Sequence, residues 1–179
     1  RDSFSSLAPE KFKGLKETVG WCAKAVDSLA DRLQFDEFQN DEFNLSEIFL
    51  SNNQDILIDS AVLSALISAC SFVYIREDNG YPRLQVIDGS NATGIIDPVT
   101  NLLTEGYAVL ERDSMGVVKT EAYFMAGMTE IYSHGVLVQR IPNAAPYALL
   151  VPIIYRPDAK RPFGHSRISR ACIAYTQTA

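Results

Sequence analysis

Residues 69–98 read ACSFVYIREDNGYPRLQVIDGSNATGIIDP and mark the change from helical to strand-forming sequence. Two runs in this stretch, 72–76 and 83–88, are rich in β-branched and aromatic residues and are joined by a segment that contains an Asn-Gly pair. Because Asn and Gly tolerate the positive φ that tight turns require, the stretch predicts a β-hairpin. Pro82 has no backbone N–H, which favours the start of a strand or the edge of a sheet.

The sequence before this stretch has helical periodicity. From residue 9 to residue 33, apolar side chains recur at steps of three and four, as on one face of an amphipathic helix. A second helical pattern opens at Ser46 and runs to Ser71, with a break expected near residues 51–53. Acidic residues and phenylalanines are mixed between the two patterns, in residues 34–46, but without the spacing of a calcium-binding loop. We therefore expect a solvated linker there, with its phenylalanines packed on the core.

The sequence after the hairpin predicts a series of short strands. Turn-forming residues at 91–94 and 97–101 punctuate two apolar runs. Gly-containing turns then separate four β-prone runs, a spacing typical of an antiparallel meander. These runs are residues 107–112, 117–124, 128–132 and 135–140. Polar and apolar residues alternate in them, so one face of the sheet should be wet and the other buried.

The C-terminal part combines prolines with positive charge. Residues 151–157 contain two prolines, which restrict this extended segment to a sheet edge or a crossover. A basic loop follows, and Ser166 is well placed as the N-cap of a helix that starts near Arg167.

Length and composition fit one α+β domain. We expect two N-terminal amphipathic helices packed on a mainly antiparallel sheet made of the hairpin and the meander, with the start of a further helix at the C-terminus. The helical part covers residues 1–71, the β-rich part 72–157, and the basic loop with the next helix 158–179. The net charge of -6 argues against a surface that attracts nucleic acid throughout. Since the chain starts at Arg1 without methionine, we expect it to be a piece of a longer protein.

Patterns that carry catalysis or metal binding are weak. The two histidines, His134 and His165, fall in or beside turns, and no nucleophile elbow or phosphate-binding glycine loop is present in the sequence. The three cysteines lack Cys-x-x-Cys spacing, so we interpret them as buried thiols rather than as a disulfide framework or a zinc site. No apolar run in the sequence approaches the ~20 residues that cross a bilayer. We expect no enzyme, cofactor, metal or membrane association.

One concentration of positive charge lies near the C-terminus. It comprises Arg156, Lys160, Arg161, Arg167 and Arg170, with His165 among them. Three interpretations remain open: a solvated surface, pairing with the acidic residues 36–42 of an adjacent subunit, or salt-dependent contact with phosphates.

Four segments, in this order, resemble the portal protein family of tailed phages, in the branch found in siphophages and prophages. The first is a helix, VGWCAKAVDSLADRL at 19–33, and the second is the helix and hairpin of residues 65–88. The third is the short turn Ile96-Asp97-Pro98, and the last is VPIIYRP leading to FGHSRI within residues 151–168. Tyr155 stands where the family pattern has Asn, and residues 107–140 match no motif of the family.

This resemblance implies a structural role. Such portal proteins form rings of about twelve subunits at one vertex of the capsid, through which the terminase motor packages DNA and through which DNA is later ejected. The chain would be part of the outer wing region, with the channel-lining helices and the terminase-docking clip beyond residue 179. The implied location is the portal vertex of the virion, after assembly in the host cytoplasm.

The resemblance also implies partners. These are other portal subunits, capsid and scaffold proteins, the terminase, and DNA that passes through the ring. As residues that contact a subunit or lie near DNA, we expect Trp21, Arg156, Arg161 and Arg167, although Trp21 would also serve as a plain core residue. The alternative function is a nucleic-acid-binding module that uses the C-terminal basic segment.

Overall fold

The computed structural model describes residues 21–168, and this range contains three helices and eight strands. The helices are α1 (Trp21–Ala30), α2 (Leu45–Ser51) and α3 (Gln54–Ser68). The strands are β1 (Cys70–Asp78), β2 (Tyr81–Asp88), β3 (Ala92–Ile96), β4 (Leu103–Arg112), β5 (Val118–Met125), β6 (Met128–Ser133), β7 (Val136–Pro142) and β8 (Leu150–Ile154). The predicted α+β class is confirmed. The predicted part of the first helix before residue 21 lies outside the described residues.

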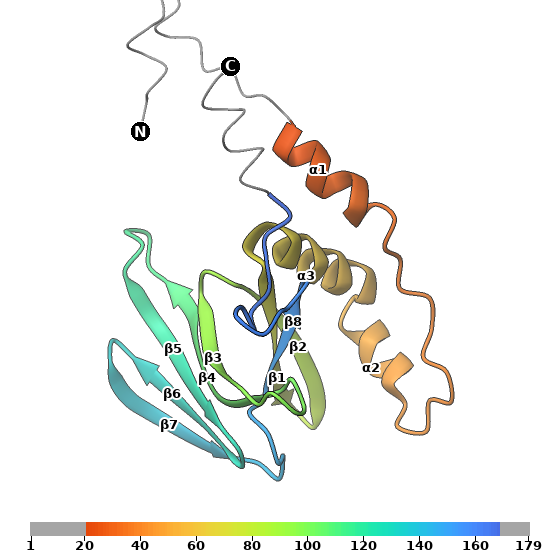
Figure 1. Ribbon diagram of the computed structural model, residues 1–179. Coiled ribbons are helices and arrows are strands. Elements are labelled where there is room, and N and C mark those ends of the chain that lie inside the picture. Colours follow the sequence, from red (N-terminus) through yellow and green to blue (C-terminus); the bar gives the residue numbers. More distant parts are fainter. Residues whose placement is uncertain (1–20, 169–179) are drawn as a thin grey trace, which may run out of the picture.

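The strands form two antiparallel sheets rather than the single sheet that we expected (Figure 1). One sheet has the order β2-β1-β8, and the other has the order β3-β4-β5-β6-β7. The hairpin and the meander are therefore separate layers. β8 completes the first sheet by pairing with β1 after the whole meander, with Val151 opposite Val73, which confirms its predicted edge position.

The three-stranded sheet is covered on both faces. α3 packs on one face through its buried side chains Leu57, Ala61 and Leu66, and the Ser71 hydroxyl donates to the Ala61 carbonyl oxygen across this contact. The other face of the sheet turns Phe72 and Tyr74 toward the five-stranded sheet, where the Tyr74 and Phe124 rings lie 5.0 Å apart. The main core is thus the layer between the two sheets.

The hairpin has the predicted tight turn. Asn79 and Gly80 both have positive φ, 53° and 82°, and Asp78 pairs with Tyr81, so the two residues close the loop by themselves. β2 is an edge strand, as Pro82 predicted. The predicted break in the second helical pattern is also confirmed, since α2 ends at Ser51 and α3 begins at Gln54.

The side chain of Asn52, in this break, covers the open edge of β2. Its Nδ2 donates to the Pro82 carbonyl oxygen at 3.0 Å, and the Leu84 N–H donates to its Oδ1 at 2.9 Å. A polar side chain between two helices thus replaces the strand partner that an edge strand lacks.

Several local predictions are wrong. α1 ends at Ala30 rather than at residue 33. α2 begins at Leu45, and its start is satisfied by Asp41, whose carboxylate accepts from the N–H groups of Leu45 and Ser46, so Ser46 does not cap it. Phe43 is 79% exposed rather than packed on the core.

The other two phenylalanines of the linker, Phe35 and Phe38, pack against Phe49 of α2 and not in the main core. Of residues 91–94, predicted to punctuate the chain, residues 92–94 instead form the start of β3. The turn at residues 97–101 is confirmed, because the Asp97 carboxylate accepts from the Val99 N–H and the Thr100 hydroxyl.

Candidate functional site

The segment after β8 folds back on the end of that strand. We call residues 155–167 the basic corner, since it contains four basic residues and one acidic residue. The Tyr155 N–H donates to the Ala69 carbonyl oxygen at 2.9 Å, and the His165 N–H donates to the Tyr155 carbonyl oxygen at 2.9 Å. Gly164 has φ +78°, and a Cβ there would lie 2.2 Å from the Tyr155 carbonyl oxygen. Only glycine allows this close return of the chain.

Asp158 organises the loop of the basic corner. One carboxylate oxygen accepts from the N–H groups of Lys160 and Arg161, both at 2.8 Å, and the other lies 2.6 Å from His165 Nε2. The Arg161 Nη1 lies 3.0 Å from His165 Nδ1. Because a guanidinium only donates and a carboxylate only accepts, this arrangement requires the imidazole proton on Nε2. The hydrogen bond from His165 holds the pKa of Asp158 below its ordinary value.

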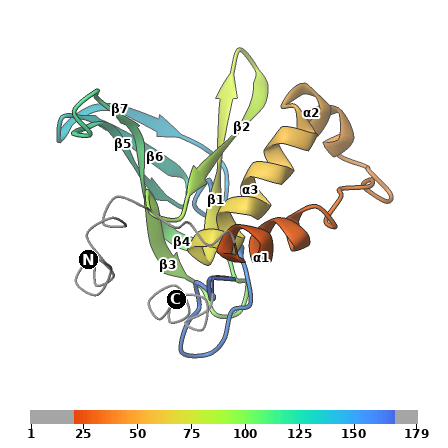
Figure 2. The same ribbon diagram turned by 90° about the horizontal axis from the view of Figure 1, so that it is seen from above.

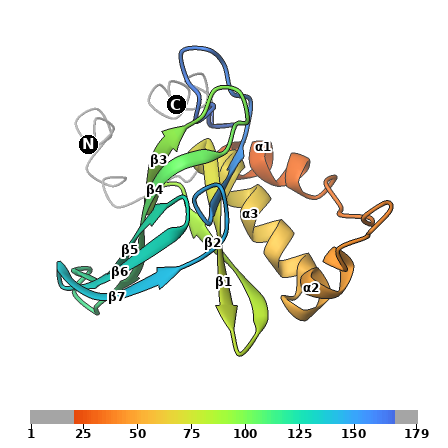
Figure 3. The ribbon, with the colours of Figure 1, turned by 90° about the horizontal axis from the view of Figure 1, so that it is seen from below.

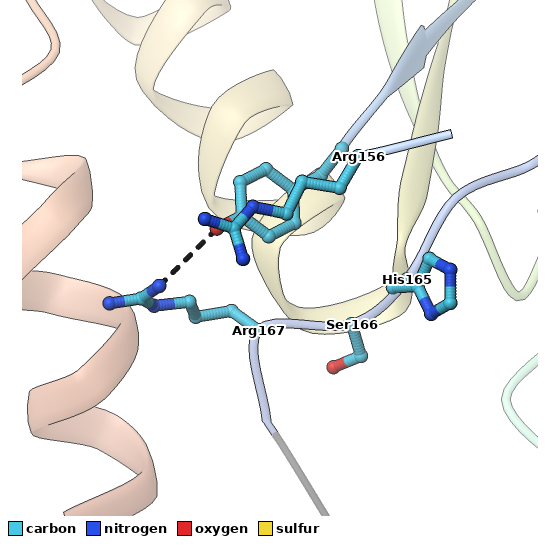
Figure 4. Close-up of a pocket in the computed structure, with 5 residues that line it drawn as sticks. Arg156, His165, Ser166 and Arg167 are labelled. Carbon is cyan, nitrogen blue, oxygen red and sulfur yellow. Dashed lines mark hydrogen bonds between the residues drawn. The ribbon is translucent and has the colours of Figure 1, made fainter. Parts of the chain in front are cut away.

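A shallow pocket of about 430 Å³ opens beside this loop (Figure 4). Its lining residues are Tyr155, Arg156, His165, Ser166 and Arg167. The Arg156 guanidinium lies over the Tyr155 ring, 5.5 Å from its centroid. Figure 4 shows the Arg156 and Arg167 side chains extending toward the same side, while His165 and Ser166 point elsewhere. The arginines therefore give this pocket its charge.

Arg167 is fixed by three different parts of the chain. Its Nε donates to the Ala25 carbonyl oxygen of α1 at 3.3 Å, and its Nη1 donates to the Tyr155 hydroxyl at 3.3 Å. Its backbone N–H donates to the Leu66 carbonyl oxygen of α3 at 2.7 Å. Among the described residues, the guanidinium is thus held by a carbonyl oxygen and a hydroxyl and not by a carboxylate.

The structure brings together two of the four predicted site residues, Arg156 and Arg167. Arg161 belongs to the neighbouring Asp158 network instead. Trp21 is the first residue of α1, and its side chain lies outside the described part of the chain, as does Arg170.

Sequence reasoning missed Asp158 and Tyr155. A signal for Asp158 was present, because Asp after Pro opens turns by accepting from the N–H groups two and three residues further on. Ser166 behaves as the predicted cap in one respect, since its Oγ accepts from the Ile168 N–H at 3.0 Å. The helix that it would cap lies outside the described residues.

Within residues 21–168, none of the arginine and lysine side chains of the basic corner forms an ion pair with a carboxylate. The pocket therefore favours an anion, which the guanidinium groups of Arg156 and Arg167 would bind by charge and by hydrogen bonds.

Other kinds of site are absent from the described part of the chain. No group of three or more His, Cys, Asp or Glu side chains in it is placed to hold a metal ion. None of its helices is long and apolar enough to cross a bilayer. In comparisons with known proteins, no family model matches the chain, and no curated protein matches its sequence.

Proposed function

We propose that this chain is an outer wing domain of a tailed-phage portal protein, a structural part of the ring through which DNA is packaged and ejected, and not an enzyme. One observation carries the proposal: three of the segments that resemble the family meet at Arg167. Its partners are Ala25 in the first segment, Leu66 in the second and Tyr155 in the last. Segments that carry one family's pattern and pack on one another support a shared architecture.

The rest of the fold agrees with the division between the segments that resemble the family and the segment that does not. The segment without a matching motif, residues 107–140, lies in the separate five-stranded sheet, which joins the rest of the described chain mainly through the core between the sheets. A separate layer can vary in sequence without disturbing the contacts at Arg167. This explains why the resemblance is interrupted there and resumes at β8.

The test is the mass of the full-length gene product that contains this chain, measured by light scattering and followed by electron microscopy of the peak. We expect closed rings of about twelve subunits from the full-length product. The 179-residue chain alone is the comparison, and we expect it to form no closed rings. A full-length product that never forms rings would contradict the proposal.

A nucleic-acid-binding module is the second candidate, and the arginines of the basic corner, which form no ion pair within residues 21–168, favour it. Anisotropy of a labelled DNA duplex titrated with the chain separates the two functions. Binding that weakens steeply with salt and is lost in Arg156→Glu would favour the module. Association of subunits without such binding favours the portal.

A further inference from the structure

A second charged surface lies between α1 and α2. We call residues 31–44 the acidic arm, because it contains five acidic residues and one arginine. Figures 2 and 3 both show this segment projecting away from the two sheets. It is nevertheless structured, since Phe35 and Phe38 pack on Phe49 of α2 and Asp41 accepts from the start of that helix.

Three carboxylates near the tip of the arm are open to a partner as far as the described residues show. Asp36, Glu37 and Glu42 are exposed, and none of them forms an ion pair within the part of the chain that the structure describes. Their backbone is held by the aromatic cluster and by Asp41, so less conformational entropy is lost when they bind than in a flexible tail.

The acidic arm and the basic corner therefore carry opposite charges, and within residues 21–168 neither forms an ion pair with the other or with the rest of the chain through its lysines, arginines or carboxylates, apart from Asp158 with His165. Figures 2 and 3 draw them as separate segments, and among the described residues no hydrogen bond or ion pair joins the arm to the corner of the same copy. We propose that the acidic arm of one copy binds the basic corner of the next, with a carboxylate in the pocket between Arg156 and Arg167. This contact deepens the proposed function and rests on it, because it names a contact between adjacent ring subunits.

The geometry of the contact is head to tail. Each copy offers one arm and one corner, which are different surfaces, and contacts of this kind build rings or open chains rather than closed dimers. The planar fork of an arginine can bind both oxygens of a carboxylate at once, whereas the ammonium of a lysine acts as a point charge. The partner is a carboxylate of a second copy rather than a DNA phosphate, since the net charge of -6 opposes a polyanion but not a local pairing.

The test reverses the charges on each side. The arm variant is Asp36→Lys with Glu37→Lys, which leaves the helix cap Asp41 intact. The corner variant is Arg156→Glu with Lys160→Glu, which leaves Arg161 and Arg167 and their hydrogen bonds in place. Arg76→Glu and Glu77→Lys are the matched controls, because both residues are exposed at the far end of β1.

Sedimentation velocity of the chain at low salt measures the association. We expect each variant to weaken it about tenfold or more, and the combined variant, or an equal mixture of the two, to restore it. The controls should leave it unchanged. A wild-type chain that does not associate, reversals without effect, or a combined variant that fails to recover would each overturn the contact.

The same variants in the full-length product separate this inference from the proposed function. Rings that form in every variant with unchanged resistance to salt would overturn the contact and leave the portal proposal standing. If the full-length product forms no rings but the combined variant still restores association, the portal proposal is contradicted and the contact stands. DNA binding that depends on the corner, without association, would overturn the contact in favour of a phosphate partner.

Discussion

The two sheets differ in what covers them. The three-stranded sheet lies between α3 and the five-stranded sheet, and its edge strand β2 is covered by Asn52. Within the described residues the five-stranded sheet is covered on one face only, and its edge strand β7 leaves Val136 65% exposed. On its open face tyrosines bond to glutamates, as Tyr107 does to Glu121 and Tyr123 to Glu105. We infer that single residues matter most in the layer between the sheets and least on the open face.

The largest effect is expected for Phe72→Ala and Phe124→Ala. Both rings are fully buried, one from each sheet, and each truncation should lower the free energy of unfolding by about 3–5 kcal/mol. Because the two rings share one core, both variants should unfold in one transition, seen by circular dichroism in urea. Tyr123→Phe on the open face is the control. A Phe124→Ala chain in which the three-stranded sheet unfolds at its original midpoint would show that the sheets are independent.

A smaller effect is expected at the covered edge. Asn52→Ala removes both hydrogen bonds to β2 and leaves the Leu84 N–H without its partner, so the free energy of unfolding should fall by about 2 kcal/mol. Hydrogen exchange should also rise more at Leu84, which loses its acceptor directly, than at Val73 in the central strand, where exchange rises only with the loss of global stability. Ser60→Ala is the matched control, since its hydroxyl donates to the Leu57 carbonyl oxygen within α3 and not to Asn52. An unchanged Leu84 exchange rate would mean that Asn52 does not protect the edge.

The contrast between the sheets also explains what the sequence could predict. The hairpin could be predicted from Asn-Gly, and the break between α2 and α3 from the polar residues 51–53, because a few neighbouring residues determine each of them. The separation of the hairpin and the meander into two sheets could not be predicted, because it depends on the pairing of Val73 with Val151, and the whole meander lies between these residues in the sequence. β3 was hidden for another reason, since Gly94 within it resembles a turn residue, whereas in the fold a Cβ there would meet the Glu105 carbonyl oxygen at 2.4 Å.

The candidate site was predictable in part. The composition of the basic segment pointed to Arg156 and Arg167, since charges that are close in sequence remain close in a short loop. It did not distinguish Arg156, which lies over the Tyr155 ring, from Arg161, which bonds to His165, because that difference depends on the return of the chain at Gly164. The partners of Arg167 in α1 and α3 are more than 100 residues away in the sequence, so no local pattern could predict them.

A pH-dependent effect is expected where α3 meets β2. Burial opposes ionisation of Asp88, but hydrogen bonds from Ser64, Ser90 and Ser68 outweigh it and lower the pKa to about 2 from 3.8. Since folding lowers this pKa, Asp88 stabilises the fold above about pH 4, and this contribution is lost as the pH falls through about 2. Asp88→Asn should cost about 1 kcal/mol or less at neutral pH, because the carboxylate is partly solvated.

Urea titrations of the wild type and of Asp88→Asn across this pH range give the check. The difference between the two chains should shrink steadily below pH 4, as the expected loss of the charged form requires. Ser64→Ala, which removes the donor at 2.6 Å, should reduce the same pH dependence in part. A difference that grows on acidification would reverse the sign of the linkage and contradict the assignment.

The smallest effect is expected on the open face, at the pair between Lys119 and Glu111. The Lys119 Nζ lies 2.7 Å from a Glu111 carboxylate oxygen, and this hydrogen bond holds the pKa of Glu111 below its ordinary value. In Lys119→Ala the pKa of Glu111, followed by NMR, should rise, although the Thr120 hydroxyl still donates to it. Stability should hardly change, and any change should vanish at high salt, because solvent screens an exposed pair. A loss comparable to that of Asn52→Ala would mean that the open face stabilises the fold as much as the covered edge does, and the contrast between the two sheets would fail.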